Sequence, residues 1–291
     1  MIPTTVDEVQ AALDREQYVA DRALAVVIHL ALQLGRPIFL EGEAGVGKTE
    51  VAKVLSKVLE EDLIRLQCYE GLDVSHALYE WDYARQMLAI RLAEAGSQAT
   101  DVKDIMSRDF IVARPLLQAI EQGAEGKRPV LLIDELDRAD EEFEAYLLEL
   151  LSDYQVTIPE VETVKAKQPP VVVITSNRTR EIHDALKRRC LYHWIDYPDF
   201  ARELAILRRK APEVPSRLAE QIAKTMQRLR AMDLFKPPGV AETLDWAAAL
   251  GVLGATELTP QVVTDTLGVV LKYQEDVDHV RASIGQALES V

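Results

Sequence analysis

The stretch GEAGVGKT constrains this chain more than any other feature of the sequence. Its residues match the P-loop pattern G-x-x-x-x-G-K-[ST]. The apolar run Pro37–Leu40 before it predicts a short buried strand, and apolar residues after it recur at the spacing of one helix face. A strand, a glycine loop and a helix in this order predict a site for a nucleoside triphosphate. The residues of the loop are Gly42, Glu43, Ala44, Gly45, Val46, Gly47, Lys48 and Thr49.

Each part of the loop has its own expected role. Glycines permit the backbone angles at which successive N–H groups turn inward around phosphate oxygens, and the following helix directs its positive end to the same place. The Lys48 ammonium is expected to reach the β- and γ-phosphates of ATP, and the Thr49 hydroxyl to bind Mg²⁺. An ordinary glycine turn is the alternative, which the predicted strand and helix disfavour.

The first two-thirds of the chain alternate short apolar runs with helical periods, which predicts a parallel sheet with flanking helices. Past Pro198 we find only helical segments, with Ser216 and Thr259 as expected N-caps. The predicted fold is therefore an α/β domain with a five-stranded sheet over residues 1–197, followed by a small all-α domain over residues 198–291. Further strands are predicted at residues 63–68, 130–133, 171–175 and 191–195, and helices at 200–210, 216–232, 240–250, 260–274 and toward 290.

Composition excludes several classes of function. The chain has 33 Lys and Arg against 48 Asp and Glu, a net charge of −15, which opposes binding to nucleic acid. No run approaches the roughly 20 apolar residues of a membrane-spanning helix, and the N-terminus lacks a signal-peptide pattern, so we predict no membrane span and a cytoplasmic location. The 2 cysteines lie far apart and the 5 histidines show no paired spacing, so we expect neither a disulfide nor a structural metal site.

Two predicted strands end in polar residues, at the edge where parallel sheets bind ligands. Asp134 is expected to hold Mg²⁺ through its water shell if its strand neighbours the P-loop, and Glu135 to orient and deprotonate the attacking water. Asn177 follows the strand at 171–175, where its amide could bind the γ-phosphate or that water. The alternatives are a solvated acidic turn and an amide that caps a turn.

Three cations in a row, Lys187, Arg188 and Arg189, end a predicted helix. They could complement the negative end of the helix dipole. Alternatively, one arginine could serve as a finger that stabilises transition-state charge at the γ-phosphate of a neighbouring subunit. The residues alone leave both interpretations open.

Together, and in this order and spacing, these segments resemble an AAA+ ATPase, and the helical tail resembles the lid of that superfamily. Within it the chain most resembles the MoxR family, close to the CoxD-like branch that is associated with maturation of carbon monoxide dehydrogenase. The narrower resemblance is carried by residues 66–73, 77–81, 134–140, 175–181 and 233–239, which read LQCYEGLD, ALYEW, DELDRAD, TSNRTRE and DLFKPPG.

The resemblance implies roles for single residues. It assigns nucleotide binding to residues 42–49, Mg²⁺ to Thr49 and Asp134, catalysis to Glu135, and the γ-phosphate sensor to Asn177. The finger acting on the next subunit falls best on Arg189, with Arg188 as the reserve. Such lids usually supply a second sensor arginine, but residues 240–244 contain none, so that role stays unassigned.

The resemblance also implies a homo-oligomeric, hexameric ring that remodels a protein client by hydrolysing ATP. The client would be a metalloenzyme such as a carbon monoxide dehydrogenase-like molybdenum hydroxylase, with a von Willebrand factor A domain adaptor as a further partner. A slow nucleotide-dependent switch or scaffold is the alternative, which Glu135 argues against because a pure binder needs no catalytic base. A DNA-acting motor is a third hypothesis, and the net charge of −15 opposes it.

Two groups of residues permit more than one interpretation. Four aromatic side chains cluster after the second strand and could either grip a client or pack in a core. Two arginines beside Asn177 could contact another subunit or lie in a solvated turn. The aromatic residues are Tyr69, Tyr79, Trp81 and Tyr83, and the arginines are Arg178 and Arg180.

Overall fold

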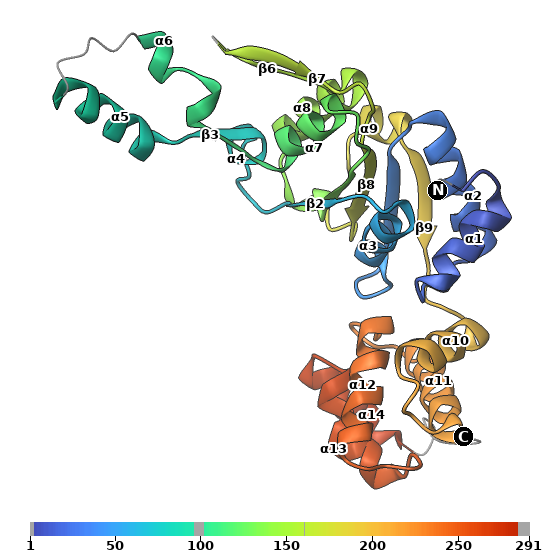
Figure 1. Ribbon diagram of the computed structural model, residues 1–291. Helices are drawn as coiled ribbons and strands as arrows, with labels where there is room; N and C mark the ends of the chain where they lie inside the picture. Colours follow the sequence, from blue (N-terminus) through green and yellow to red (C-terminus); the bar gives the residue numbers. More distant parts are fainter. Residues whose placement is uncertain (1–2, 96–101, 160, 285–291) are drawn as a thin grey trace.

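The computed structural model describes residues 3–95, 102–159 and 161–284 (Figure 1). The five predicted strands form one parallel sheet in the order β2-β5-β8-β1-β9. Past this sheet the described chain is helical, so the predicted fold class is confirmed. The strands are β1 (Ile38–Gly42), β2 (Leu63–Gln67), β5 (Val130–Asp134), β8 (Val171–Ser176) and β9 (Leu191–Ile195).

Helices cover both faces of the sheet because the central strands are apolar on both sides. In β1, Ile38 and Leu40 pack into one core and Phe39 into the other, as the period of two requires. The first core includes α1 (Val6–Arg15), α2 (Arg22–Leu34) and α3 (Lys48–Leu59). The second includes α7 (Pro115–Ala124), α8 (Glu141–Asp153) and α9 (Asp184–Arg189).

The order of the strands corrects one premise of the sequence analysis. Strand β8 lies between β5 and β1, so the strand that ends at Asp134 does not neighbour the strand before the P-loop. All three strands are parallel and in close register, with Val173 paired to Leu132 on one side and to Ile38 on the other. Their carboxyl ends therefore meet at one edge of the sheet.

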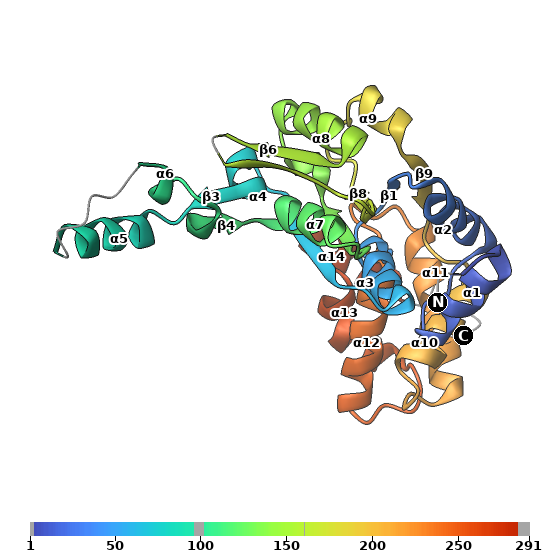
Figure 2. The same ribbon diagram turned by 45° about the horizontal axis from the view of Figure 1, so that its top comes forward.

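An arm and a hairpin that the sequence did not predict extend from this domain. Both views show α5 and α6 lying away from the sheet, joined to it through the antiparallel pair β3 and β4 (Figures 1 and 2). The arm consists of α4 (Val74–Leu78), β3 (Tyr79–Trp81), α5 (Tyr83–Ala95), α6 (Val102–Ile105), a 3₁₀ turn (Arg108–Phe110) and β4 (Ile111–Ala113). The hairpin consists of β6 (Gln155–Ile158) and β7 (Glu162–Lys165), and a second 3₁₀ turn spans Leu136–Arg138.

The C-terminal helices enclose a core of their own around the buried Trp246. The helix predicted over residues 260–274 ends earlier, at Val270, because Leu271 is extended, and the next helix begins at Gln274. These helices are α10 (Phe200–Lys210), α11 (Ser216–Ala231), α12 (Val240–Val252), α13 (Pro260–Val270) and α14 (Gln274–Ala282). The last helix is predicted to run toward residue 290, which lies outside the described residues. The domain boundary after residue 197 stays a prediction.

Only one of the two predicted caps is present. The Thr259 hydroxyl accepts a hydrogen bond from the N–H of Val262 at the start of α13, as expected. The prediction for Ser216 is wrong, because Pro215 occupies the N-cap position of α11 and Ser216 is already the first helical residue.

A buried ion pair joins three of the C-terminal helices. Arg230 of α11 binds both carboxylate oxygens of Glu203 in α10, each at 2.7 Å, and both side chains are almost fully buried. The Thr243 hydroxyl of α12 donates to the same carboxylate at 2.7 Å. Arg230 Nε also donates to the Pro238 carbonyl at 2.8 Å, just before α12 begins. The pair thus fixes where α12 starts.

We therefore expect Arg230→Ala to lower the free energy of unfolding by about 3–5 kcal/mol, because it leaves the Glu203 carboxylate buried without its partner. Urea denaturation followed by circular dichroism measures this loss. Arg208→Ala is the matched control, since Arg208 and Glu220 form an exposed ion pair expected to contribute at most about 1 kcal/mol. Equal losses in both variants would contradict the assignment.

Candidate nucleotide site

A cleft of about 440 Å³ lies between the P-loop and the C-terminal helices. The P-loop forms one side of it, and α10 and α12 form the other. Asp134, Glu135 and Asn177 reach into the same cleft, so the structure brings together the polar strand ends and the loop. Beyond these, the lining includes Gln17, Tyr18, Val19, Lys53, Pro198, Arg202, Ile206, Lys210, Val240, Ala241 and Leu244.

Two glycines of the P-loop occupy positions that other residues would not tolerate. A Cβ atom on Gly42 would lie 2.2 Å from the carbonyl oxygen of Ile195, so strand β9 passes too close for any side chain. Gly47 has a φ of 96° at the N-cap of α3, where L-residues are strained. These glycines let the loop turn tightly from β1 into α3.

The Lys48 side chain is buried and folds back against the loop. Its ammonium donates to the Gly42 carbonyl at 2.7 Å and to the Glu43 carbonyl at 2.6 Å. Burial lowers the pKa of Lys48, and the nearby carboxylates, Asp137 foremost, oppose this shift. The charge of Lys48 therefore lies at the place where phosphates are expected.

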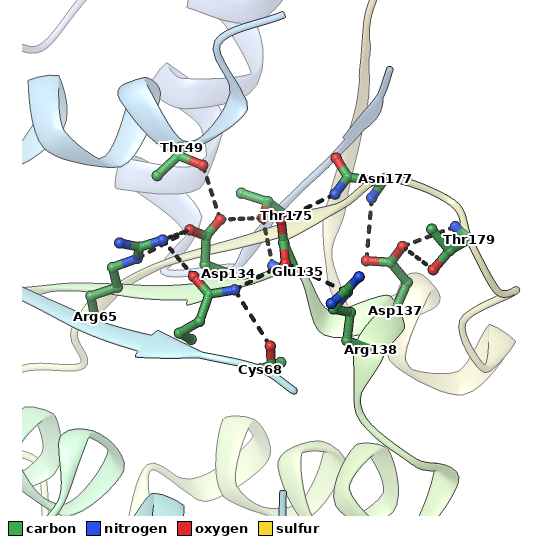
Figure 3. A network of polar contacts seen from close by, with 11 residues as sticks. Thr49, Arg65, Cys68, Asp134, Glu135, Asp137, Arg138, Thr175, Asn177 and Thr179 are labelled. Carbon is green, nitrogen blue, oxygen red and sulfur yellow. Dashed lines mark hydrogen bonds and ion pairs between the residues drawn. The ribbon is translucent and has the colours of Figure 1, made fainter. Parts of the chain in front are cut away.

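The carboxylate of Asp134 is the centre of a polar network (Figure 3). Its Oδ1 accepts hydrogen bonds from Thr49 Oγ1 at 3.0 Å and from Thr175 Oγ1 at 2.6 Å. Its Oδ2 accepts two from the guanidinium of Arg65, at 3.1 Å from Nε and 2.6 Å from the terminal nitrogen. A hydroxyl beside a buried carboxylate is a set of hard oxygen donors that fits Mg²⁺.

Glu135 follows in an unusual backbone conformation. It has φ 56° and ψ 52°, and its N–H donates to Thr175 Oγ1 at 2.9 Å. Such left-handed positions cost of order 1–3 kcal/mol and gather at functional sites. The Glu135 carboxylate accepts hydrogen bonds from Gln67 Nε2 at 3.1 Å and Asn177 Nδ2 at 3.4 Å. The structure thus places Asn177 directly beside the expected catalytic base.

Sequence reasoning missed four side chains of this network: Arg65, Gln67, Asp137 and Thr175. Arg65 and Gln67 alternate with apolar residues in β2, and polar residues on one face of a parallel-sheet strand are a signal that could have been noticed. Asp137 is buried and holds the turn after Asn177, since it accepts a bond from the Asn177 N–H at 3.2 Å and two bonds from Thr179. Asp137 gave no signal that would separate it from a solvated acid.

The arginines at the end of α9 do not line the cleft. Arg189 is exposed and donates to the Leu148 carbonyl of α8 at 2.6 Å. Arg188 is also exposed, and its guanidinium has no hydrogen bond or ion pair among the described residues. Arg36, just before β1, donates to the carbonyls of Arg188 and Arg189 at 2.7 and 3.0 Å. The backbone of this pair is therefore held firmly at the surface.

A second contact joins α9 to β1. Lys187 forms an ion pair of 3.1 Å with Glu41, a buried residue directly before the P-loop. The Tyr192 hydroxyl of β9 donates to the same carboxylate at 3.0 Å. Both ends of β1 are thus linked to the helix that carries the two arginines.

The start of α12 lies against the P-loop. The N–H groups of Val240 and Ala241 both donate to the Gly45 carbonyl, at 3.0 and 3.2 Å. A Cβ atom on Gly239 would lie 2.8 Å from the Ala44 carbonyl, so only glycine permits this approach. The contact between α12 and the P-loop is therefore made by backbone groups, at the place where the resemblance predicts a second sensor arginine that residues 240–244 lack.

Two C-terminal cations do reach the cleft. Arg202 of α10 binds the Val19 carbonyl at 3.1 Å and Asp21 at 3.0 Å, and Lys210 pairs with Glu50 at 3.3 Å. Each already has a partner on the other side of the cleft. They hold α10 against the α/β domain at both of its ends.

The residues that the sequence left open fall into different environments. Tyr79 and Trp81 are half-buried against the core and meet edge to face, whereas Tyr69 and Tyr83 are exposed. Arg180 forms an ion pair with the buried Glu144 and donates to the Ala139 carbonyl at 2.5 Å, so it has a structural role within this chain. The exposed Arg178 forms an ion pair with Glu181, at 3.4 Å.

No helix in the described ranges is long and apolar enough to cross a membrane.

Residues 37–190, more than half of the chain, match the family model described as AAA domain (dynein-related subfamily). The gas vesicle ATPase GvpN of Haloferax mediterranei is 25% identical over 278 residues, which cover 89% of this chain and 76% of the relative. GvpN1 of Halobacterium salinarum is 24% identical over 272 residues, with the same shares covered. The match extends beyond the sheet into the C-terminal helices.

A crystal structure of a Cytophaga hutchinsonii protein has a TM-score of 0.50 to this chain at 16% identity. It covers 98% of this chain and 94% of its own. At this identity the likeness shows that the two chains share a fold.

Proposed function

The chain belongs to the dynein-related subfamily of AAA domains and is an ATPase, and we propose that it couples ATP hydrolysis to remodelling of a protein client. The observation that carries the hydrolysis part of the proposal is the position of Glu135, which shares the cleft with the P-loop and accepts a hydrogen bond from Asn177, whereas the protein client rests on the family resemblance. A protein that only binds nucleotide needs no carboxylate at this place. ATP hydrolysis therefore explains why Glu135 and Asn177 lie in the cleft, which nucleotide binding alone does not explain.

For binding, the P-loop N–H groups and the N-terminus of α3 would hold the phosphates, and Lys48 would exchange its two carbonyl partners for phosphate oxygens. Residues Tyr18, Val19, Ile206 and Leu244 supply the apolar part of the cleft, which suits a nucleobase. Because α12 hydrogen-bonds to Gly45, any movement of the loop would reach the lid directly.

Thr49 and Asp134 are the residues that would hold Mg²⁺, which when bound neutralises charge on the β- and γ-phosphates. Glu135 would take a proton from the attacking water. The oxygen of that water would form a bond to the γ-phosphorus while the bond from this phosphorus to the bridging oxygen breaks. Asn177 would orient the same water or the γ-phosphate through its amide. The bridging oxygen leaves with ADP.

The site would be completed by a neighbouring subunit. Arg188 and Arg189 lie outside their own cleft and are exposed, which suits a finger delivered to the γ-phosphate of the next subunit in a ring. The family resemblance favours Arg189, while Arg188 is the one whose guanidinium lacks a partner within the described residues. A hexamer is the ring that the resemblance implies.

The narrower part of the proposal concerns the client. Resemblance to the CoxD-like branch of the MoxR family supports a metalloenzyme client, such as a carbon monoxide dehydrogenase-like molybdenum hydroxylase, with a von Willebrand factor A domain adaptor in the cytoplasm. Two of the relatives are named gas vesicle ATPases and others are uncharacterized staphylococcal proteins, so the relatives support an ATPase and the client rests on the resemblance alone. A slow nucleotide-dependent switch remains the alternative function.

Glu135→Gln should retain ATP affinity within about threefold and lose turnover by about 100-fold or more, because it removes only the base. Lys48→Ala, the binding control, should lose ATP affinity. Isothermal titration and phosphate release measure the two effects. Negligible turnover in the wild-type protein at all concentrations would instead support the switch.

Arg188→Ala and Arg189→Ala should behave differently. The variant that lacks the finger should bind ATP normally but lose turnover by about 10³-fold or more. Mixing it with Lys48→Ala subunits should restore activity, since about a quarter of the interfaces in a random equal mixture join an intact P-loop to an intact finger. No recovery for either variant at any mixing ratio would exclude a finger supplied by the neighbour.

The client is tested by its effect on ATP turnover. Purified metal-free molybdenum hydroxylase should raise the turnover of the wild-type protein and not that of Glu135→Gln, whereas the mature, metal-loaded enzyme should have little effect. Single- and double-stranded DNA at low salt are the controls. Stimulation by DNA alone would replace the proposed client with a nucleic acid, and no stimulation by the metal-free enzyme would reject the metalloenzyme role.

A further inference from the structure

Arg65 is a cation at the place where the proposed function puts a metal ion. It extends from β2 to Asp134, which ends the neighbouring strand β5, and binds Oδ2 through two nitrogens (Figure 3). The Asp134 carboxylate is 3% exposed, whereas the Arg65 side chain is 51% exposed. The pair therefore joins a buried anion to a cation that can still reach solvent.

A count of hydrogen bonds shows that this carboxylate is fully used. An ionised carboxylate offers about four lone-pair positions. Thr49 and Thr175 occupy two of them on Oδ1, and Arg65 occupies two on Oδ2. A water bound to Mg²⁺ can donate to Asp134 only if one of these partners moves.

Arg65 is the partner that can move at least cost. Thr49 is itself a proposed metal ligand and stays close to Asp134 in either case. Thr175 is buried, and its hydroxyl also accepts the N–H of Glu135 at 2.9 Å. The Arg65 side chain is long and half-exposed, so its guanidinium can move into solvent, and a water bound to Mg²⁺ can then donate to the Oδ2 of Asp134 that it leaves.

We propose that Arg65 is a built-in competitor of Mg²⁺: its guanidinium neutralises Asp134 until nucleotide brings the metal, and so limits how much Mg²⁺ strengthens nucleotide binding. The inference rests on the proposed role of Asp134 as the metal-binding carboxylate. Arg65 also hydrogen-bonds Gln67 Oε1, and Gln67 Nε2 binds Glu135 at 3.1 Å. Displacement of Arg65 therefore removes one of the restraints on the side chain that holds the catalytic base.

The test is the ratio of two dissociation constants for a non-hydrolysable ATP analogue, measured in EDTA and in excess Mg²⁺. In Arg65→Gln this ratio should rise about tenfold over wild type, because the variant has no guanidinium to compete for Asp134 and no unit charge to repel a divalent ion, a repulsion that at close range is worth about that factor even in water. Metal-free binding should weaken, since Asp134 is left as a bare anion near the phosphates. Binding with Mg²⁺ should become tighter.

Two further variants serve as controls for charge and for the fold. Arg65→Lys keeps the charge but loses the two-nitrogen contact, so its ratio should lie between those of wild type and Arg65→Gln. Arg217→Gln removes an arginine from an exposed ion pair with Glu257, outside the residues that line the cleft, and should leave the ratio unchanged. Affinity for Mn²⁺ in the analogue complex, followed by electron paramagnetic resonance, should rise in parallel for Arg65→Gln.

An unchanged or smaller ratio in Arg65→Gln would overturn the proposal, because Arg65 would then support the site or have no part in it. Asp134→Asn separates this outcome from failure of the proposed function. If that variant keeps the wild-type ratio, Asp134 is not the metal-binding carboxylate and both inferences fall. If it loses the Mg²⁺ effect while Arg65→Gln leaves the ratio unchanged, only the role of Arg65 falls.

Discussion

The site depends on one buried carboxylate. Asp134 joins four separate elements, because Thr49 lies in the first turn of α3, Thr175 lies in β8, Arg65 comes from β2, and Asp134 itself ends β5. Burial makes these bonds costly to lose unless another partner replaces the one that leaves, since an unpaired Asp134 carboxylate would have no access to water. The network therefore fixes the distance between the P-loop and Glu135, the two parts that hydrolysis requires to be close.

The position of β8 between β5 and β1 explains how the network aligns Asp134 and Glu135. A direct β5–β1 contact would have placed Asp134 beside the P-loop without an intermediary. Instead, Thr175 of the inserted strand donates to Asp134 and accepts the N–H of Glu135, so it positions both acids. The same strand leads to Asn177, whose amide reaches Glu135. Thr175 of this strand and Asn177 just after it thus align the carboxylates that we propose as metal ligand and as base.

The sequence predicted all five strands of the sheet, because the central ones are apolar runs, as in Val130–Ile133, and the two edge strands are rich in apolar residues. It failed where contacts are made across the fold. The α4 to β4 arm is held by an antiparallel pair of three-residue strands, too short for a periodic signal. The roles of Arg65 and Asp137 depend on which strands are neighbours, and single-sequence patterns do not contain that order. The helices at 200–210 and 240–250 could be predicted because the spacing of apolar residues along a helix is set by neighbouring residues in the sequence and does not depend on the rest of the fold.

Strand β1 contacts both the P-loop and the helix α9, the two parts of the chain that would meet at the interface between subunits of a ring. At its end Gly42 opens the P-loop, and the preceding Glu41 binds Lys187 of α9. At its start Arg36 holds the carbonyls of Arg188 and Arg189. A shift of the P-loop on binding phosphate would therefore move the Glu41–Lys187 ion pair, and with it α9, the helix that carries Arg188 and Arg189. If Arg188 or Arg189 acts on the next subunit, strand β1 would link the P-loop of one cleft to the arginine that enters the neighbouring cleft.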